Sequence, residues 1–162
     1  MKNVLSLHRH LRNANTMIRG IRNNNPLNIR FNAANNWRGK VLSSMRTDKD
    51  FEEFCSMDYG FLAALNLIGN TYMAKYHLNT PSAIIRRFAP PSENNTDGYI
   101  QSVCRMTGLG GEEVISNHDT RLRELVFAMA QVECGAEIKR YREDLEKAWA
   151  VYEPKPSKKG RK

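Results

Sequence analysis

The first 47 residues of this 162-residue chain contain no aspartate or glutamate, although they contain nine lysine and arginine residues. The last nine residues, 154–162, also lack acids and add five basic residues. Acidic residues are confined to 48–153, where seventeen of them outnumber eleven basic ones. Because the net charge of +8 gathers at the two ends, we expect an anionic partner, either a nucleic acid or an anionic polymer of a bacterial wall.

Cysteine is scarce, with only Cys55, Cys104 and Cys134 in the chain. The three form no Cys-x-x-Cys pair and their number is odd, which argues against both a structural zinc site and a disulfide framework. We therefore predict neither a metal nor a cofactor, and synthesis in a reducing cytoplasm.

Long hydrophobic runs are also missing. The longest one within the chain, 61–69, includes Asn66 and is too short to cross a bilayer. The apolar stretch after Lys2 is cut short at His8, before it reaches the length of a signal-peptide core. The sequence thus predicts no membrane span and no signal peptide.

Internal repeats and long linkers are absent as well, which predicts a single domain at 19–152. The flanking segments 1–18 and 153–162 have no apolar period, so we expect a flexible basic arm and a disordered basic tail. Within the domain, apolar spacing and capping residues predict a mainly α (α+β) fold. The expected helices cover 59–76, a segment opened by Thr80 and Pro81 and ended before Pro90, a segment from Thr96 to Gly108, one from Asp119 or Thr120 to Gly135, and 136–152.

Two short alternating runs, 40–44 and 51–55, precede these helices and predict one small β-hairpin. Before them, the segment 19–30 contains the four amides Asn23, Asn24, Asn25 and Asn28 around a stiffening proline, and Trp37 follows. Paired amide donors and acceptors beside a flat apolar ring suit hydroxyl and acetamido groups, so we predict a glycan-binding cleft. The alternative is an asparagine-rich turn that satisfies only its own backbone.

Glu133 continues the apolar stripe Leu122, Leu125, Val126 and Met129 of the fourth expected helix. A carboxyl group on such a row lies near the rim, pairs with a base, or has a raised pKa. A raised pKa is what a general acid needs to cleave a glycosidic bond near neutral pH. The alternative is a helix-end glutamate that turns to solvent before Gly135.

The segment 128–135, Ala-Met-Ala-Gln-Val-Glu-Cys-Gly, resembles the end of the catalytic helix in lysozyme-like lytic transglycosylases and bacterial glucosaminidases. In those families an asparagine-rich stretch, a Trp-x-Gly and a short β region follow directly. Here these features stand at the other end of the chain, in 25–29 and 37–39, so the order resembles a circular permutation. If it is one, Glu133, Asn25 and Trp37 should line one cleft.

The span 19–135 also resembles small virion structural proteins of phages and conjugative elements, which are assigned to the lysozyme-like fold. The shared pattern is Arg-Gly-x-Arg-Asn-Asn-Asn-Pro, Trp-x-Gly, Asp-x-x-Phe-x-x-Phe, Tyr-Gly and Phe-Ala-Pro-Pro-x-Glu-Asn. Two departures stand out. Leu27 replaces a glycine that many relatives have, and Cys134 replaces the serine after the catalytic glutamate.

This resemblance implies a peptidoglycan glycosidase or lytic transglycosylase of phage or mobile-element type that cleaves the β-1,4 bond between N-acetylmuramic acid and N-acetylglucosamine. Glu133 would be the general acid. Asp48 would orient water or stabilise the oxocarbenium ion, with a turn or cap residue as its alternative, and Glu93 would be a third carboxylate or a loop brace. The expected glycan-binding residues are Asn25, Asn28, Trp37, Arg22, Arg30 and Tyr99, although core packing is the stronger interpretation of Tyr99.

Two other functions stay open. One is a non-catalytic virion structural or wall-binding protein, with other virion or transfer-apparatus proteins as partners, that retains the lysozyme-like shape. The other is nucleic-acid binding, which we do not favour because the chain has no helix-turn-helix, zinc-finger or RNA-binding motif. An enzyme of this kind would act at the cell wall or in a virion after delivery by another system.

Overall fold

A computed structural model describes residues 17–158, so most of the expected N-terminal arm and the last four residues lie outside the described part. The described chain is mainly helical, as the sequence predicts. Its α-helices are α2 (Arg19–Arg22), α3 (Met57–Leu65), α4 (Pro81–Phe88), α5 (Thr96–Thr107), α6 (Thr120–Cys134) and α7 (Arg142–Val151). Short 3₁₀ segments, η1 (Ser43–Met45) and η3 (Ala136–Tyr141), and a π-helix, η2 (Asn66–Lys75), complete the order.

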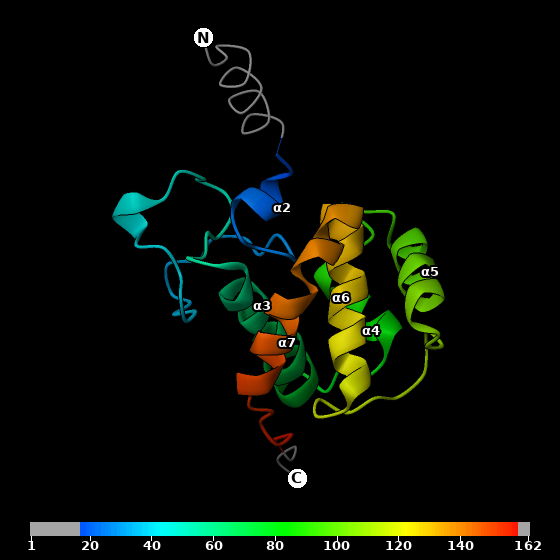
Figure 1. The fold of residues 1–162 in the computed structure, drawn as a ribbon. Coiled ribbons are helices and arrows are strands. Elements are labelled where there is room, and N and C mark those ends of the chain that lie inside the picture. The colour runs from blue at the N-terminus through cyan, green and yellow to red at the C-terminus, as the bar shows by residue number, and fades with distance from the viewer. Residues whose placement is uncertain (1–16, 159–162) are drawn as a thin grey trace.

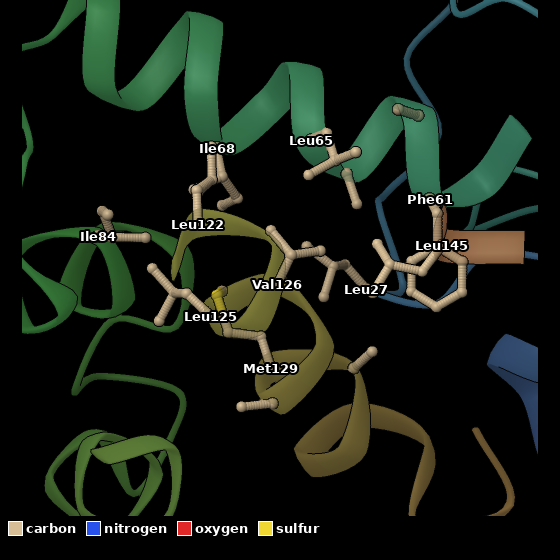
Figure 2. Packing of buried hydrophobic residues seen from close by; sticks show 14 of the residues in the cluster. Leu27, Phe61, Leu65, Ile68, Ile84, Leu122, Leu125, Val126, Met129 and Leu145 are labelled. Carbon is tan, nitrogen blue, oxygen red and sulfur yellow. The ribbon is translucent and has the colours of Figure 1, made fainter. Parts of the chain in front are cut away.

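Helix α6 runs through the middle of the domain, with α4 and α5 on one side and α3 and α7 on the other (Figure 1). The stripe that the sequence predicts on α6, from Leu122 to Met129, is fully buried. It packs against Phe61 and Leu65 of α3, Ile68 of η2 and Ile84 of α4 (Figure 2). Each such side chain contributes roughly 1.5–3 kcal/mol of hydrophobic stabilisation.

The helix ends follow the capping residues closely. The Thr80 hydroxyl accepts a hydrogen bond from the Ala83 backbone N–H (3.2 Å), and the Asp119 carboxylate accepts one from the Arg121 N–H (2.8 Å). At the other ends, Gly108 and Gly135 have φ values of 74° and 77°, which side chains with a Cβ rarely adopt. Polar caps and left-handed glycines thus set the ends of α4, α5 and α6.

The predicted cap of α5 was wrong by one residue. Asn95, and not Thr96, caps the helix, because its side-chain oxygen accepts a hydrogen bond from the Gly98 N–H (3.1 Å). The Thr96 hydroxyl is buried and donates to the Ala89 carbonyl oxygen (2.5 Å). Thr96 therefore ties α5 to the end of α4 instead of capping its own helix.

The helix predicted over 59–76 is two elements in the structure. The α-helix α3 continues without a break into η2, whose ten residues have the wider π-helical hydrogen-bonding pattern. π-Helices are rare and usually only one turn long, often at functional sites. Periodicity predicted a helix here, but it does not distinguish α from π over ten residues.

The predicted hairpin is not shown, since the structure has only two isolated antiparallel bridges among residues 17–158, Arg30 with Phe51 and Lys40 with Phe54. The backbone of 51–54 alternates between two neighbours: the Glu52 N–H donates to the Ile29 carbonyl (2.9 Å), whereas the Glu53 carbonyl accepts from the Val41 N–H (2.8 Å). Because the backbone of 51–54 is divided between these two neighbours, neither pairing is long enough to form a β-strand within the described residues 17–158.

Residues 153–158, within the expected tail, contact the body of the domain. Their backbone forms hydrogen bonds with Asn70, Ala74 and Asn117 on the body of the domain. Within residues 17–158, every helix is too short or too polar to cross a bilayer.

Candidate functional site

Glu133 lies one residue before the end of α6 and is half-buried. It lines a cavity of about 420 Å³ together with side chains from several other parts of the chain. They include Asn28 and Arg30 from the segment after α2, Leu67 and Tyr72 from η2, and Glu93 from the loop after α4. The sequence thus brings one acid from the central helix together with polar groups from the asparagine-rich segment.

Burial raises the pKa of Glu133 to about 7, because removing the carboxylate from water disfavours its charged form. The side-chain amide of Asn28 opposes this effect by hydrogen bonding to the carboxyl group. At neutral pH a large fraction of Glu133 therefore carries a proton. A carboxyl group of this kind can donate a proton to an oxygen placed in the cavity.

Close packing between α6 and α2 holds Glu133 beside Asn28. A Cβ on Gly20 of α2 would lie 2.5 Å from the Cys134 sulfur and 2.8 Å from the Asn28 side-chain oxygen. Such distances are shorter than contact, so only glycine permits this approach. Asn28 itself has a left-handed φ of 51°, a conformation that asparagine tolerates better than most residues.

Arg30 and Glu93 bring opposite charges to the same cavity, and both side chains are exposed. The Arg30 guanidinium lies 5.4 Å from the centre of the Phe51 ring, a cation–π distance. The Glu93 backbone N–H donates to the Pro90 carbonyl oxygen (3.1 Å), which fixes the loop that carries it. The exposed charges of Arg30 and Glu93 thus lie on the solvent side of the cavity, and Glu133 is more buried.

The structure does not bring Asp48 into this cavity. Its carboxylate is buried and forms a bidentate ion pair with Arg19, with two N–O distances of 2.6 Å. The carboxylate also accepts hydrogen bonds from the Asn23 amide (2.9 Å) and from two backbone N–H groups of its own turn. The Arg19 hydrogen bond, followed by that from Asn23, holds the pKa of Asp48 well below its usual range. These contacts correspond to the alternative role of Asp48, that of a turn residue.

Three of the expected glycan-binding residues also do not line the Glu133 cavity. Asn25 is fully buried, where its amide donates to the Ile29 and Glu52 carbonyls and accepts from the Ile29 N–H. Arg22 is exposed beside Asp48 (3.6 Å). Trp37 lines a separate cavity of about 300 Å³. Neither Trp37 nor Asn25 lines the cavity of Glu133, to which the asparagine-rich segment contributes Asn28 instead, and the permutation stays a prediction.

Tyr99 occupies the core position that was its stronger interpretation. It is buried on α5, its ring packs edge-to-face on Phe88 with centroids 6.4 Å apart, and its hydroxyl donates to the Met129 carbonyl (3.4 Å). Of the nine expected site residues, Glu133, Glu93, Asn28 and Arg30 line one cavity. Asn25, Arg22, Trp37, Tyr99 and Asp48 do not.

One curated relative resolves the affiliation of the chain. The chain is 33% identical to protein P5 of Pseudoalteromonas phage PM2 over 142 residues, which cover 85% of each protein. The chain belongs to the protein P5 family. No protein-family model matches it. The expected relationship to a phage protein is therefore shown, whereas the relationship to lysozyme-like enzymes is not.

Several residues of the site in this member of the P5 family were not predicted from the sequence. Leu67 and Tyr72 on η2, Phe51 and Phe88 line the cavity, as does Asn94 beside Glu93. Tyr72 and Phe88 lie in segments with a helical period, a position where an aromatic side chain is more often part of the core. Phe88 and Asn94 belong to the Phe-Ala-Pro-Pro-x-Glu-Asn motif, which was the available indication. Among residues 17–158 there is no cluster of three metal-ligating side chains.

Proposed function

We propose that this P5-family protein cleaves the β-1,4 bond between N-acetylmuramic acid and N-acetylglucosamine in peptidoglycan, with Glu133 as the general acid. The observation that carries this proposal is the half-buried Glu133, with its pKa raised to about 7, in a cavity lined by amides, a cation and aromatic rings. A protonated carboxyl group in such a cavity suits acid catalysis near neutral pH, a contribution of roughly 10²–10⁴ in rate.

The placement of Asp48 favours a lytic transglycosylase over a hydrolase that uses two carboxylates. Asp48 is engaged by Arg19, Asn23 and its own turn, so it is not available to orient water. Glu93 lines the cavity but is exposed. A reaction in which one glutamate suffices therefore fits the site best.

In that reaction the Glu133 proton passes to the glycosidic oxygen as its bond to the anomeric carbon breaks, and the electron pair of the bond stays with the oxygen. The 6-hydroxyl oxygen of the muramyl residue then attacks the anomeric carbon and gives its proton to the Glu133 carboxylate. The products are a free hydroxyl on the leaving sugar and a 1,6-anhydromuramyl end, and Glu133 regains its proton.

The other cavity residues supply binding. Asn28 offers an amide whose side-chain oxygen is buried and has no hydrogen-bond partner among residues 17–158, and Arg30 offers a cation for a substrate carboxylate. Tyr72 and Phe88 give apolar surface for sugar rings. Glu93 would then hydrogen-bond hydroxyl groups at the opening.

A lysozyme-like fold belongs to the same proposal. The helical domain, with its acid near the end of the central buried helix, supports it. The phage relative supports a role in which a phage particle carries the protein to the cell wall.

Turbidity and zymogram assays on purified wild type and Glu133→Gln test the proposal. Glu137→Gln is the matched control, because Glu137 is exposed only four residues further on and does not line the cavity. We expect lysis from wild type and the control, and a loss of at least about 100-fold in Glu133→Gln. Equal lysis by wild type and Glu133→Gln would refute the assignment.

A non-catalytic virion or wall-binding protein is the second candidate, favoured by one observation. Trp37, the side chain best suited to stacking on a sugar, lines a different cavity from Glu133. In this case purified protein sediments with isolated cell walls equally well as wild type and as Glu133→Gln, and neither form lyses them.

A further inference from the structure

Residues 153–158, which we call the C-terminal strap, leave α7 and run along the domain without regular secondary structure. Pro154 and Pro156 flank Lys155 and restrict the φ angles of the strap. In Figure 1 the strap is the red segment that emerges below α7. Its hydrogen bonds with the domain are formed by its backbone N–H and carbonyl groups, so they do not depend on the basic side chains of the tail.

Asn70, in the middle of η2, binds the strap twice. Its side-chain oxygen accepts a hydrogen bond from the Lys155 N–H (2.7 Å), and its amide donates to the Glu153 carbonyl (3.1 Å). The same amide donates to the Asn66 side chain at the start of η2 (2.8 Å). One side chain therefore joins the strap to the first turn of the π-helix.

Asn117 makes a second connection from the segment before α6. Its amide donates both to the Gly69 carbonyl of η2 (3.1 Å) and to the Lys155 carbonyl of the strap (2.7 Å). Tyr152 donates to the Asn117 carbonyl (2.9 Å), and the Lys158 N–H donates to the Ala74 carbonyl near the end of η2 (3.3 Å). Hydrogen bonds from outside the helix thus reach η2 along most of its length.

A π-helix of ten residues needs this support, because π-helices are rare and mostly limited to a single turn within an α-helix. Gly69 illustrates how closely the neighbours approach: a Cβ there would lie 1.9 Å from the Tyr152 hydroxyl oxygen. The supported face of η2 carries Asn66, Gly69 and Asn70. Leu67 and Tyr72 of the same helix line the Glu133 cavity.

The geometry points to Asn70 and Asn117 as positioning residues, which use the C-terminal strap to hold η2 in its π-helical form and so keep Leu67 and Tyr72 in the wall of the Glu133 cavity. Neither amide lines the cavity, so both act through η2. The consequence for lysis rests on the proposed function, whereas the consequence for the cavity does not.

The test compares three full-length variants. Asn70→Ala removes the central connection, and Pro154→Gly/Pro156→Gly loosens the strap without altering any side chain of the domain body. Lys155→Ala is the control, because only the backbone of Lys155 takes part in the hydrogen bonds given above. Amide hydrogen exchange across 66–75 and a ¹³C NMR titration of the Glu133 carboxyl group are measured on each, with far-ultraviolet circular dichroism as the check on folding.

In Asn70→Ala and in the double glycine variant we expect amides of 66–75 to exchange at least about tenfold faster than in wild type, while α6 amides stay protected. Water entering the loosened cavity lowers the Glu133 pKa from about 7 towards its ordinary value. The control matches wild type in both measurements. If Asn70→Ala fails to fold, the double glycine variant alone decides.

Exchange and pKa that stay at wild-type values in the double glycine variant would overturn the inference. The result is separable from the proposed function. A lowered pKa and faster exchange, in a protein whose wild type lyses no cell wall, support the positioning role while removing the enzymatic one. Wall lysis by wild type, together with unchanged exchange and an unchanged Glu133 pKa in the variants, supports the enzymatic role and removes the positioning role.

Discussion

The Cys134 thiol at the end of α6 donates a hydrogen bond to the Pro26 carbonyl oxygen, 3.4 Å away and 108 positions earlier in the chain. Burial raises the pKa of this thiol to about 12, so it keeps the proton that it donates. The contact fixes the end of the central helix against the asparagine-rich segment. Glu133, the preceding residue, is held beside Asn28 as a result.

Gly20→Ala tests this packing. A Cβ at Gly20 would meet the Cys134 sulfur at 2.5 Å and the Asn25 carbonyl at 2.9 Å, and the backbone cannot yield easily. We expect a loss of about 1–3 kcal/mol in the free energy of unfolding, measured by urea denaturation. Gly110→Ala is the control, since its Cβ would lie no closer than 3.8 Å to any neighbour. Equal stabilities of the two variants would contradict the close approach of α2 and α6.

Glu133→Gln should stabilise the folded protein at alkaline pH. The folded-state pKa of Glu133 lies above its ordinary value, so its contribution to stability is greatest below pH 4.5 and is lost as pH rises through about 7. Glutamine has no charge to bury. We expect the variant to exceed wild type by about 2 kcal/mol near pH 8, after allowance for partial exposure, and to match it near pH 4. A pH-independent difference in urea denaturation would count against a buried, protonated Glu133.

Asn28→Gly should move the pH dependence of lysis. The Asn28 amide lowers the pKa of Glu133, so its removal raises that pKa and carries the alkaline limb of the rate profile to higher pH. Glycine suits the left-handed φ of 51° at this position, so the backbone is preserved. Turbidity rates between pH 5 and pH 9 measure the shift. An alkaline limb that stays in place, or moves to lower pH, would show that the amide does not act on the acid.

Asp48→Asn should affect stability and not chemistry. The variant loses the charge of a buried group that accepts hydrogen bonds from Arg19, Asn23 and its own turn, at a cost of about 3 kcal/mol. Because the folded-state pKa is depressed, this stability is present above pH 3.8 and disappears as the pH falls below it. Asp50→Asn, at an exposed carboxylate beside the same arginine, should cost much less. Lysis per folded molecule should equal wild type, and a fall of 100-fold would restore Asp48 as catalytic.

Local sequence patterns predicted the helices because their determinants are local. Thr80, Gly108, Asp119 and Gly135 mark helix ends through contacts with neighbouring backbone, and the α6 stripe needs only a helical period. Glu133 was found for the same reason, as a carboxylate that continues this stripe. The π-helical form of η2 escaped prediction because it depends on Asn117 and the strap, which are distant in sequence.

The asparagine-rich segment shows where residue type alone misleads. Asn25 and Asn28 are equally suited to bind sugar hydroxyls. The Asn25 amide, however, donates to the Ile29 and Glu52 carbonyls, whereas the Asn28 side-chain oxygen has no hydrogen-bond partner within the described residues 17–158. Their roles differ because 51–54 pairs with one side of the segment and α6 packs against the other. Asp48 is likewise engaged by residues distant in sequence, Arg19 and Asn23.

The central claim, that Glu133 is the general acid of a lytic transglycosylase, is tested most directly by mass spectrometry of muropeptides released from purified peptidoglycan. We expect wild type and Glu137→Gln to release 1,6-anhydromuramyl products, and Glu133→Gln to release at least about 100-fold less. Products with a reducing muramyl end would contradict the transglycosylase mechanism. Anhydro products formed equally by Glu133→Gln, or no products from folded wild type, would contradict the claim itself.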